Sequence, residues 1–317
     1  MIKFQFLAQD LPQTAVEKGK GITPGDMGRL ALVTFLWAIC FPLIAVGLTM
    51  APPLTFAALR AFVAGGGLLL LAFALRRPWP RGWAVWLTLL GVGLSLTSIG
   101  FGGMFLAGGL VSPGLATVLA NIQPLIAAAL AGIVLGEMLG SRRRWGLFLG
   151  FTGIILVALP GFGSSVNSNP AGVGFILLGA VGVAVGNVLL KRLAGQVDIL
   201  MATGWQFVLG GLPLLLLAQQ FELPAQIEWN ILFVIVLLAL GLLGTSLAFV
   251  LWFSLLHRSE LNRLNTFTFL TPVFALMIGA LFFGESLGLV EVGGIALILA
   301  GVLWVSHQGP PSSLEVL

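Results

Sequence analysis

Long apolar stretches separated by short polar joints fill almost the whole of this 317-residue chain. Most of the ten stretches reach the ~20 residues that a helix needs to cross ~30 Å of hydrocarbon. The pattern predicts an all-α integral membrane protein with ten transmembrane helices. The expected spans are 28–48, 54–75, 83–107, 112–136, 143–160, 171–192, 198–218, 229–256, 260–284 and 287–306.

Basic residues occupy alternate joints between these stretches. They precede the first stretch and lie at or near the ends of the second, fourth, sixth and eighth, whereas the odd-numbered joints hold none. By the positive-inside rule, tails 1–27 and 307–317 are both expected on the cytoplasmic side of a multi-pass protein in a bacterial-type cytoplasmic membrane. The residues that set this pattern are Lys3, Lys18, Lys20, Arg29, Arg76, Arg77, Arg81, Arg142, Arg143, Arg144, Lys191, Arg192, Arg258 and Arg263.

The composition excludes a soluble globule, because 58% of the residues are hydrophobic and only 8% are charged. The 15 Lys and Arg outnumber the 11 Asp and Glu, but they are spread along one membrane face. This charge therefore indicates the lipid bilayer, and not nucleic acid, as the partner. Cys40 is the single cysteine, which leaves no disulfide framework and no cysteine-based metal site. We expect a monomer that binds a small-molecule substrate and needs no cofactor or metal.

The chain matches itself without a gap when it is shifted by 148 residues. The repeat is five helices long, an odd number, so its second copy must cross the membrane upside down. The sequence thus predicts two inverted five-helix repeats, 28–160 and 171–306, which can open a midplane site to each side in turn. The matched pairs are Gly93/Gly241, Leu94/Leu242, Thr97/Thr245, Ser98/Ser246, Phe101/Phe249, Phe105/Phe253, Pro124/Pro272, Gly136/Gly284, Glu137/Glu285, Gly140/Gly288, Gly146/Gly294 and Gly153/Gly301.

These motifs resemble those of a known family. Pro124 followed by Gly-Glu at 136–137, repeated as Pro272 followed by Gly-Glu at 284–285, looks like the fourth and ninth helices of the drug/metabolite transporter superfamily, in its EamA-like branch. The stretch from Trp37 to Pro42 and Arg60 also resemble that family, and the resemblance covers about residues 28–306. It implies a transporter that exports amino acids or other small metabolites. The related four-helix drug exporters carry a glutamate in their first helix that is absent here, so proton-driven drug antiport by that route is not expected.

Polar residues at membrane depth should face other helices or a wet cavity, because hydrocarbon cannot satisfy them. Asn121 and Gln123 lie beside Pro124, and Thr268 and Thr271 lie beside Pro272. A proline inside a helix kinks it and frees a carbonyl, so we expect kinks at Pro42, Pro124 and Pro272. We favour a cavity position for Asn121 and Gln123. For the Thr-Ser pairs at 97–98 and 245–246 we favour a structural role in tying helices together, since hydroxyls can also bond the carbonyls of their own helix.

Arg60 lies inside the second span, and three interpretations are open. It can extend along the lipid to the headgroups, oppose a substrate carboxylate or phosphate, or bond backbone carbonyls. Lys191 is interpreted as a positive-inside anchor and Asn187 as a cavity residue. An apolar and amide wall of the same cavity is assigned to Trp37, Trp205 and Gln206.

No carboxylate is predicted at the membrane centre, so an acid-based proton or sodium site has no ligand there. Glu137 and Glu285 fall at span ends and are assigned a structural role. An intramembrane enzyme would need a nucleophile with a base, paired aspartates or metal ligands, and His257 and His307 lie at span ends. We therefore predict a non-enzymatic, non-ATP carrier of an amino acid or related compound. One alternative is a phosphorylated-sugar or nucleotide-sugar exchanger, which needs Arg60 and Lys191 together in the cavity. From another class, an intramembrane enzyme or a channel also remains an alternative.

Overall fold

The computed structural model describes residues 23–108, 110–111, 119–136, 140–162, 169–224, 226–282 and 288–306. The described secondary structure consists of helices. Two of the membrane-crossing runs each continue through a π-helical segment, η2 or η3. The elements are α1 (Pro24–Leu48), α2 (Pro53–Ala74), α3 (Trp83–Val92), η2 (Gly93–Phe101), α4 (Gly102–Leu106), α6 (Gln123–Leu135), α7 (Ser141–Phe162), α8 (Pro170–Leu193), α9 (Ile199–Phe221), α10 (Ile231–Leu238), η3 (Ala239–Leu247), α11 (Ala248–Leu256), α12 (Leu261–Phe267), α13 (Leu270–Phe282) and α14 (Leu289–Ser306).

Six helical runs within the described residues are long and apolar enough to cross a membrane, and three shorter helices are also apolar. Many large apolar side chains on these helices are exposed, as lipid-facing residues must be. The molecule is therefore an integral, multi-pass, all-helical membrane protein. Outside the fourth and ninth predicted spans, the helix bounds agree with the sequence to within a few residues.

The fourth and ninth spans differ from the prediction because neither is one continuous helix. The described part of the fourth span turns at Asn121 and Ile122 before α6 begins. The ninth span is broken at Thr268 and Phe269, between α12 and α13. Pro124 and Pro272 lie in the first turns of α6 and α13. A first-turn amide has no partner within its own helix, so proline is tolerated there and does not kink a helix interior.

Three other features of the helices concern Pro42, Gly136 and the two glutamates assigned to helix ends. Pro42 lies inside α1, where the sequence places it. Gly136 ends α6 with a φ of 66°, a left-handed conformation that a glycine adopts without strain. Glu137 and Glu285, assigned to helix ends, lie outside the described residues.

The two π-helical segments were not anticipated. Each carries one of the matched Thr-Ser pairs. The hydroxyls of Ser98, Thr245 and Ser246 donate to carbonyls five residues earlier, whereas that of Thr97 has no partner among the described residues. Thr245 Oγ1 donates to Leu240 O at 2.8 Å, and Ser246 Oγ donates to Gly241 O at 3.0 Å. Segments of this type are rare and occur frequently at functional sites.

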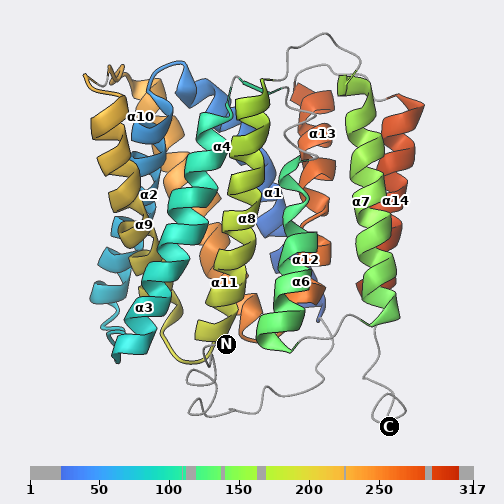
Figure 1. The fold of residues 1–317 in the computed structure, drawn as a ribbon, viewed down its shortest axis with the longest axis horizontal. Coiled ribbons are helices and arrows are strands. Elements are labelled where there is room, and N and C mark those ends of the chain that lie inside the picture. The colour runs from blue at the N-terminus through green and yellow to red at the C-terminus, as the bar shows by residue number, and fades with distance from the viewer. Residues whose placement is uncertain are drawn as a thin grey trace, which may run out of the picture.

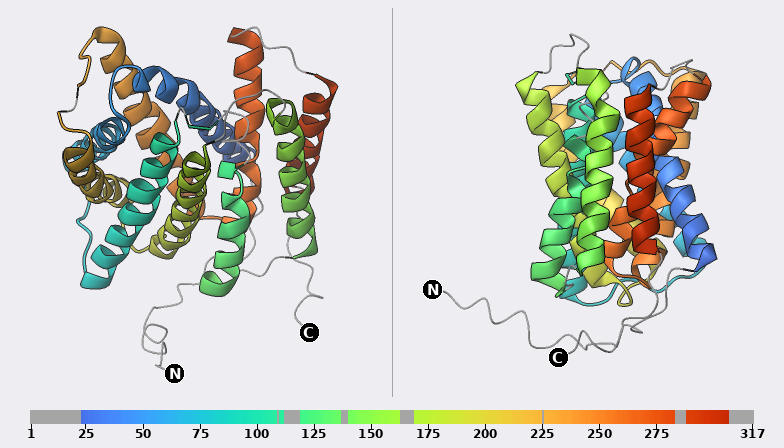
Figure 2. Two further views of the ribbon diagram at one scale, coloured as in Figure 1. Left: turned by 45° about the horizontal axis from the view of Figure 1, so that its top comes forward. Right: turned by 90° about the vertical axis from the view of Figure 1, so that its right-hand side faces the viewer.

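The described helices form a bundle with two end faces (Figure 1). We call the end where α1 begins and α14 ends the lower face, and the end where α2 begins the upper face. Two long helix pairs run along the bundle: α2 packs on α9, and α7 packs on α14 (Figures 1 and 2). The α3–η2–α4 run lies against both α8 and α9, and η3 lies against α2.

The α7–α14 pair approaches closely through two reciprocal glycine contacts. A Cβ added at Gly153 would lie 2.6 Å from Gly294 O, and one added at Gly301 would lie 2.8 Å from Gly146 O. Gly294 follows Gly146, and Gly301 follows Gly153, by the same 148 residues. Only glycine allows backbones to come this close in a bundle without a side chain between them.

Charge and tryptophan mark the ends of the bundle. The α2–α3 joint with Arg76, Arg77 and Arg81, the start of α7 and the end of α8 all lie at the lower face (Figure 1). The tryptophans near helix ends are each more than half exposed, as an interfacial belt requires. They are Trp79, Trp83, Trp145, Trp229 and Trp304.

Replacing Gly153 with alanine is expected to lower the free energy of unfolding by about 1–3 kcal/mol, because the new Cβ meets the backbone of α14. The matched control is Gly174→Ala on α8, where a Cβ meets nothing within 4 Å and helix propensity favours alanine. Thermal unfolding in detergent should show Gly153→Ala below wild type and Gly174→Ala at or above it. Equal behaviour of the two variants would contradict the close α7–α14 contact.

Candidate functional site

Arg60 is buried inside the bundle. It is the eighth residue of α2, about 10 Å along the helix from the upper face, and only 4% of it is exposed. Its Nε donates to Thr245 Oγ1 at 2.8 Å, and its Nη2 donates to Cys40 Sγ at 3.5 Å. The guanidinium carbon lies 4.6 Å from the centre of the Phe101 ring and 5.8 Å from that of Phe105. The side chain is therefore directed into the bundle and does not extend along the lipid.

The positive charge of Arg60 is only partly compensated. No described carboxylate lies within ion-pair distance of Arg60, whereas Arg29 pairs with Asp26 and Arg77 with Asp198. Removing a guanidinium from water costs several kcal/mol, of which a hydroxyl acceptor and a ring face recover a part. A bound carboxylate would complete the compensation.

A row of aromatic rings leads from Arg60 through the bundle. Phe101 stacks on Phe207 with ring centres 5.9 Å apart, and Phe207 meets Phe249 edge to face at 5.2 Å. Trp37 then contacts Phe249 at 5.7 Å and Trp252 at 5.4 Å. The rings come from α1, η2, α9 and α11, so Trp37 lies where both halves of the chain meet.

Asn187 lies at the far end of this row. Its Oδ1 accepts a hydrogen bond of 2.9 Å from Trp252 Nε1, and both side chains are buried. The cavity residue expected at this position is thus bonded across the α8–α11 contact.

Lys191, one turn further along α8, holds the end of α11 at the lower face. Its Nζ donates to the carbonyl oxygens of Leu256 and Ser259. Burial lowers the pKa of the neighbouring His257, and the charges of Lys191 and Arg258 act in the same direction. The imidazole is therefore neutral at pH 7, and its Nδ1 lies 2.9 Å from Phe253 O.

Two further buried polar residues, Gln206 on α9 and Thr97 on η2, lie where these two elements cross. Gln206 and Thr97 are both fully buried. Within the described part of the chain, neither the amide atoms of Gln206 nor Thr97 Oγ1 has a hydrogen-bond partner. The crossing is close: a Cβ at Gly93 would lie 2.7 Å from Gln206 O, and one at Gly210 would lie 2.5 Å from Thr97 Cβ.

The residues around the two helix breaks are partly brought together. Gln123 is buried at the start of α6, which packs against α12, and its Nε2 has no partner among the described residues. Thr268 Oγ1 donates to Asn265 O at 2.7 Å, while the buried amide of Asn265 has no partner in the same part of the chain. Asn121 and Thr271 are half-buried beside these breaks. Unbonded buried amides are uncommon, so this region can accept a polar solute or water.

Trp205 is not brought together with Trp37. Its ring contacts Trp86 at 5.1 Å and Trp79 at 5.7 Å, in a tryptophan cluster on α9, α3 and the α2–α3 joint. Trp205 precedes Gln206 in α9, and successive residues of a helix point about 100° apart. The predicted wall of Trp37, Trp205 and Gln206 is therefore divided between two places.

The structural role predicted for the Thr-Ser pairs, tying helices together, is confirmed by both serines. Both hydroxyls of the second pair bond their own helix, as expected. Ser98 Oγ also donates to Gly210 O at 2.7 Å, and Ser246 Oγ to Ala64 O at 3.1 Å, so each pair also joins two helices. Cys40 and the rings of Phe101 and Phe105 were missed as neighbours of Arg60. Phe101 and Phe105 were already visible in the repeat, but that signal does not specify which helix they face.

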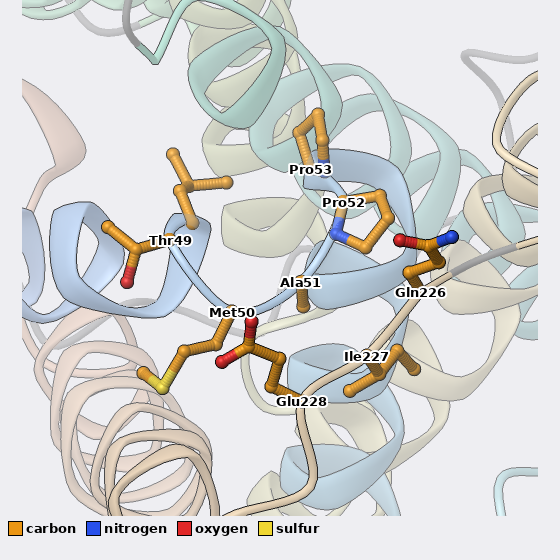
Figure 3. A pocket seen from close by; sticks show the side chains of 9 residues that line it. Thr49, Met50, Ala51, Pro52, Pro53, Gln226, Ile227 and Glu228 are labelled. Atoms are coloured by element: carbon orange, nitrogen blue, oxygen red, sulfur yellow. The ribbon is translucent and has the colours of Figure 1, made fainter.

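A solvent-open hollow of about 600 Å³ lies at the upper face (Figure 3). It is lined by the α1–α2 joint, 48–53, and by residues 226–228 before α10. Glu228 N bonds Met50 O at 2.8 Å, and the Glu228 side chain extends toward the α1–α2 joint. Nearby, the Glu222 carboxylate accepts from the backbone amides of Leu54 and Thr55, both at 2.7 Å. This caps the start of α2 and ties it to the end of α9.

Comparisons with known proteins agree with this fold. The model of the EamA-like transporter family matches residues 28–159 and 170–307. A chloroplastic WAT1-related protein of Arabidopsis thaliana is 33% identical over 91% of this chain and 72% of its own length. An uncharacterized transporter of Synechocystis is 31% identical over 86% of this chain and 87% of its own. A probable amino-acid metabolite efflux pump of Salmonella typhimurium is 29% identical over 87% and 93%, respectively. One crystal structure, 19% identical, superposes with a TM-score of 0.76 over 89% of this chain and 98% of that chain, which shows the same fold.

The bond between Trp252 and Asn187 can be tested by a double-mutant cycle. Trp252→Phe leaves Asn187 Oδ1 without its donor and should lower the free energy of unfolding by about 1–3 kcal/mol. Adding Asn187→Leu should recover part of that loss, because no buried polar group is then left unpaired. Thermal unfolding measures the cycle, with the exposed Trp229→Phe as control. Strictly additive effects of the two substitutions would show that the bond is absent.

Proposed function

Since the chain belongs to the EamA-like transporter family, we propose that it is a secondary carrier of a small metabolite. The simplest substrate is an amino acid or a related compound, moved in the export direction. Relatives of this chain are named as transporters and an efflux pump, not as enzymes. The proposed mechanism is alternating access about a central site.

The observation that carries the substrate class is the buried charge of Arg60. Its bonds within the described chain go to a hydroxyl and a thiol, and no described carboxylate opposes it. A solute with one carboxylate would supply the missing negative charge, and the rings of Phe101 and Phe207 would receive its apolar part. Gln123 and Asn121, with Thr268 and Thr271 on the facing break, extend the proposed path toward the lower face.

The symmetry of the contacts supports ten membrane crossings in two inverted repeats, 28–160 and 171–306. Gly153 meets Gly294 as Gly301 meets Gly146, which is the reciprocity expected of two related copies. The packing of α6 on α8 has its counterpart in the packing of α13 on α1. Two such halves can exchange conformations and so move the opening from one side to the other.

The proposed orientation follows from charge. The basic joints lie at the lower face, so we assign that face to the cytoplasm, with both tails, 1–27 and 307–317, on that side of a bacterial-type membrane. We assign the protein as a monomer in the bilayer, without a cofactor. The described carboxylates lie at or beyond helix ends, so we assign the driving force to exchange or to downhill export, not to proton uptake by a buried acid.

A phosphorylated-sugar exchanger of the same fold would need Arg60 and Lys191 on one cavity. Lys191 Nζ instead bonds two carbonyl oxygens at the end of α11, near the lower face, whereas Arg60 lies about 10 Å from the upper face. The geometry thus favours a solute with a single anionic group. A channel is the alternative from another class, and counterflow distinguishes it from a carrier.

The test is counterflow in proteoliposomes that are preloaded with unlabelled amino acid and supplied with the labelled form. Arg60→Gln is expected to raise the half-saturating concentration about 10–100-fold, the loss of one charge-assisted contact, and Arg60→Lys to retain part of the activity. Arg81→Gln, in an exposed joint, is the matched control and should behave as wild type. Saturable counterflow with an unchanged half-saturating concentration in Arg60→Gln would refute the proposed binding of the solute carboxylate by Arg60. Flux of the labelled amino acid without counterflow would refute the carrier mechanism.

A further inference from the structure

The π-helical segments η2 and η3 contact α9 and α2, respectively, in matching ways. Ser98 in η2 donates to Gly210 O on α9, and Ser246 in η3 donates to Ala64 O on α2. Ser246 follows Ser98 by 148 residues, and Gly210 follows Ala64 by 146. The same two shifts relate Thr97 to Thr245 and Arg60 to Gln206. The Gln206–Thr97 pair is therefore the counterpart of the Arg60–Thr245 pair in the other half of the chain.

The two pairs differ in their bonding. Arg60 Nε donates to Thr245 Oγ1 at 2.8 Å, so this pair is closed. Gln206 and Thr97 are 0% exposed, yet in the described chain the amide and the hydroxyl have no partner, so the second pair is open. Buried polar groups left unbonded cost free energy. Such a cost is expected where a group finds its partner in a second conformation or in a ligand.

We propose that the two pairs close in turn during transport. In the state described here, Arg60 is held by Thr245, and the open Gln206 and Thr97 can take an ammonium or hydroxyl group of the solute. In the opposite-facing state, Gln206 bonds Thr97, and the released Arg60 receives the carboxylate. This inference rests on the proposed carrier function. It adds a second polar contact to the solute, made by the uncharged Gln206 and Thr97, beside that of the charged Arg60.

Cys40 provides a reporter for this exchange. It is the single cysteine of the chain, it is 6% exposed, and it accepts a hydrogen bond from Arg60 Nη2. It also lies 3.7 Å from Gly244 O in η3, next to Thr245. Release of Arg60 from Thr245 would loosen this contact and expose the thiol, so the native protein can be labelled without a cysteine-free background.

The experiment measures the rate at which N-ethylmaleimide labels Cys40 in the full chain, reconstituted in vesicles without solute. Thr245→Val removes the bond of the closed pair and should raise the rate about tenfold, whereas Gln206→Leu removes the bond of the opposite state and should lower it by a similar factor. Thr97→Val should act like Gln206→Leu, which provides a second variant on the same side. Two α9 controls should label as wild type: Thr203→Val, whose hydroxyl bonds Ile199 O, and the exposed Gln219→Leu.

Labelling rates of Cys40 that rise in Thr245→Val and fall in Gln206→Leu support the exchange between the two pairs. Shifts of the same sign, or no shift for both Gln206→Leu and Thr97→Val, would overturn it, because simple loss of packing can only raise the labelling rate. Counterflow by the wild type in the same vesicles separates the two proposals. Opposite shifts without counterflow would support the exchange and refute the amino-acid carrier. Counterflow without opposite shifts would keep the carrier and refute the exchange.

Discussion

The buried guanidinium of Arg60 is the constraint on which the centre of this structure depends. A charge inside an apolar bundle must be compensated by nearby groups, and each group that surrounds Arg60 comes from a different part of the chain: Cys40 from α1, Phe101 from η2 and Thr245 from η3. The arginine therefore ties α2 to both halves of the molecule. Because a hydroxyl and a thiol are weak counterparts for a full charge, the same position is where a solute carboxylate gains most from binding.

The helices can surround this charge closely because glycine allows their backbones to approach. Gly93 and Gly210 bring η2 against α9, and Gly241 brings η3 against Val63 and Ala64 of α2. At these crossings the serine of each Thr-Ser pair donates to the neighbouring helix, Ser98 to α9 and Ser246 to α2. Packing of this type has few intermediate arrangements, so movement is expected as a change between two packed states and not as a gradual deformation.

The membrane class and most of the helix bounds could be predicted from the sequence, because hydrocarbon thickness sets the length of an apolar helix. The sequence left three interpretations of Arg60 open, since hydropathy places a residue at a depth but does not give its direction. It also expected kinked helices at Pro124 and Pro272, where the structure begins new helices; proline removes one amide in either case, and only the packing decides between the two. The Thr-Ser pairs were visible in the repeat, but their partners on α2 and α9 are 182 and 112 residues distant in the chain. No local pattern specifies such pairs.

A solute carboxylate is expected to complete the compensation of the Arg60 charge. The most direct measurement compares the thermal stabilisation of the purified protein by an amino acid with that by the corresponding amino acid amide, which keeps the side chain and the amino group but lacks the negative charge. We expect the amino acid to raise the melting temperature in a saturable manner, the amide to leave it unchanged, and Arg60→Gln to abolish the difference. Equal stabilisation by the amide and the amino acid would contradict it.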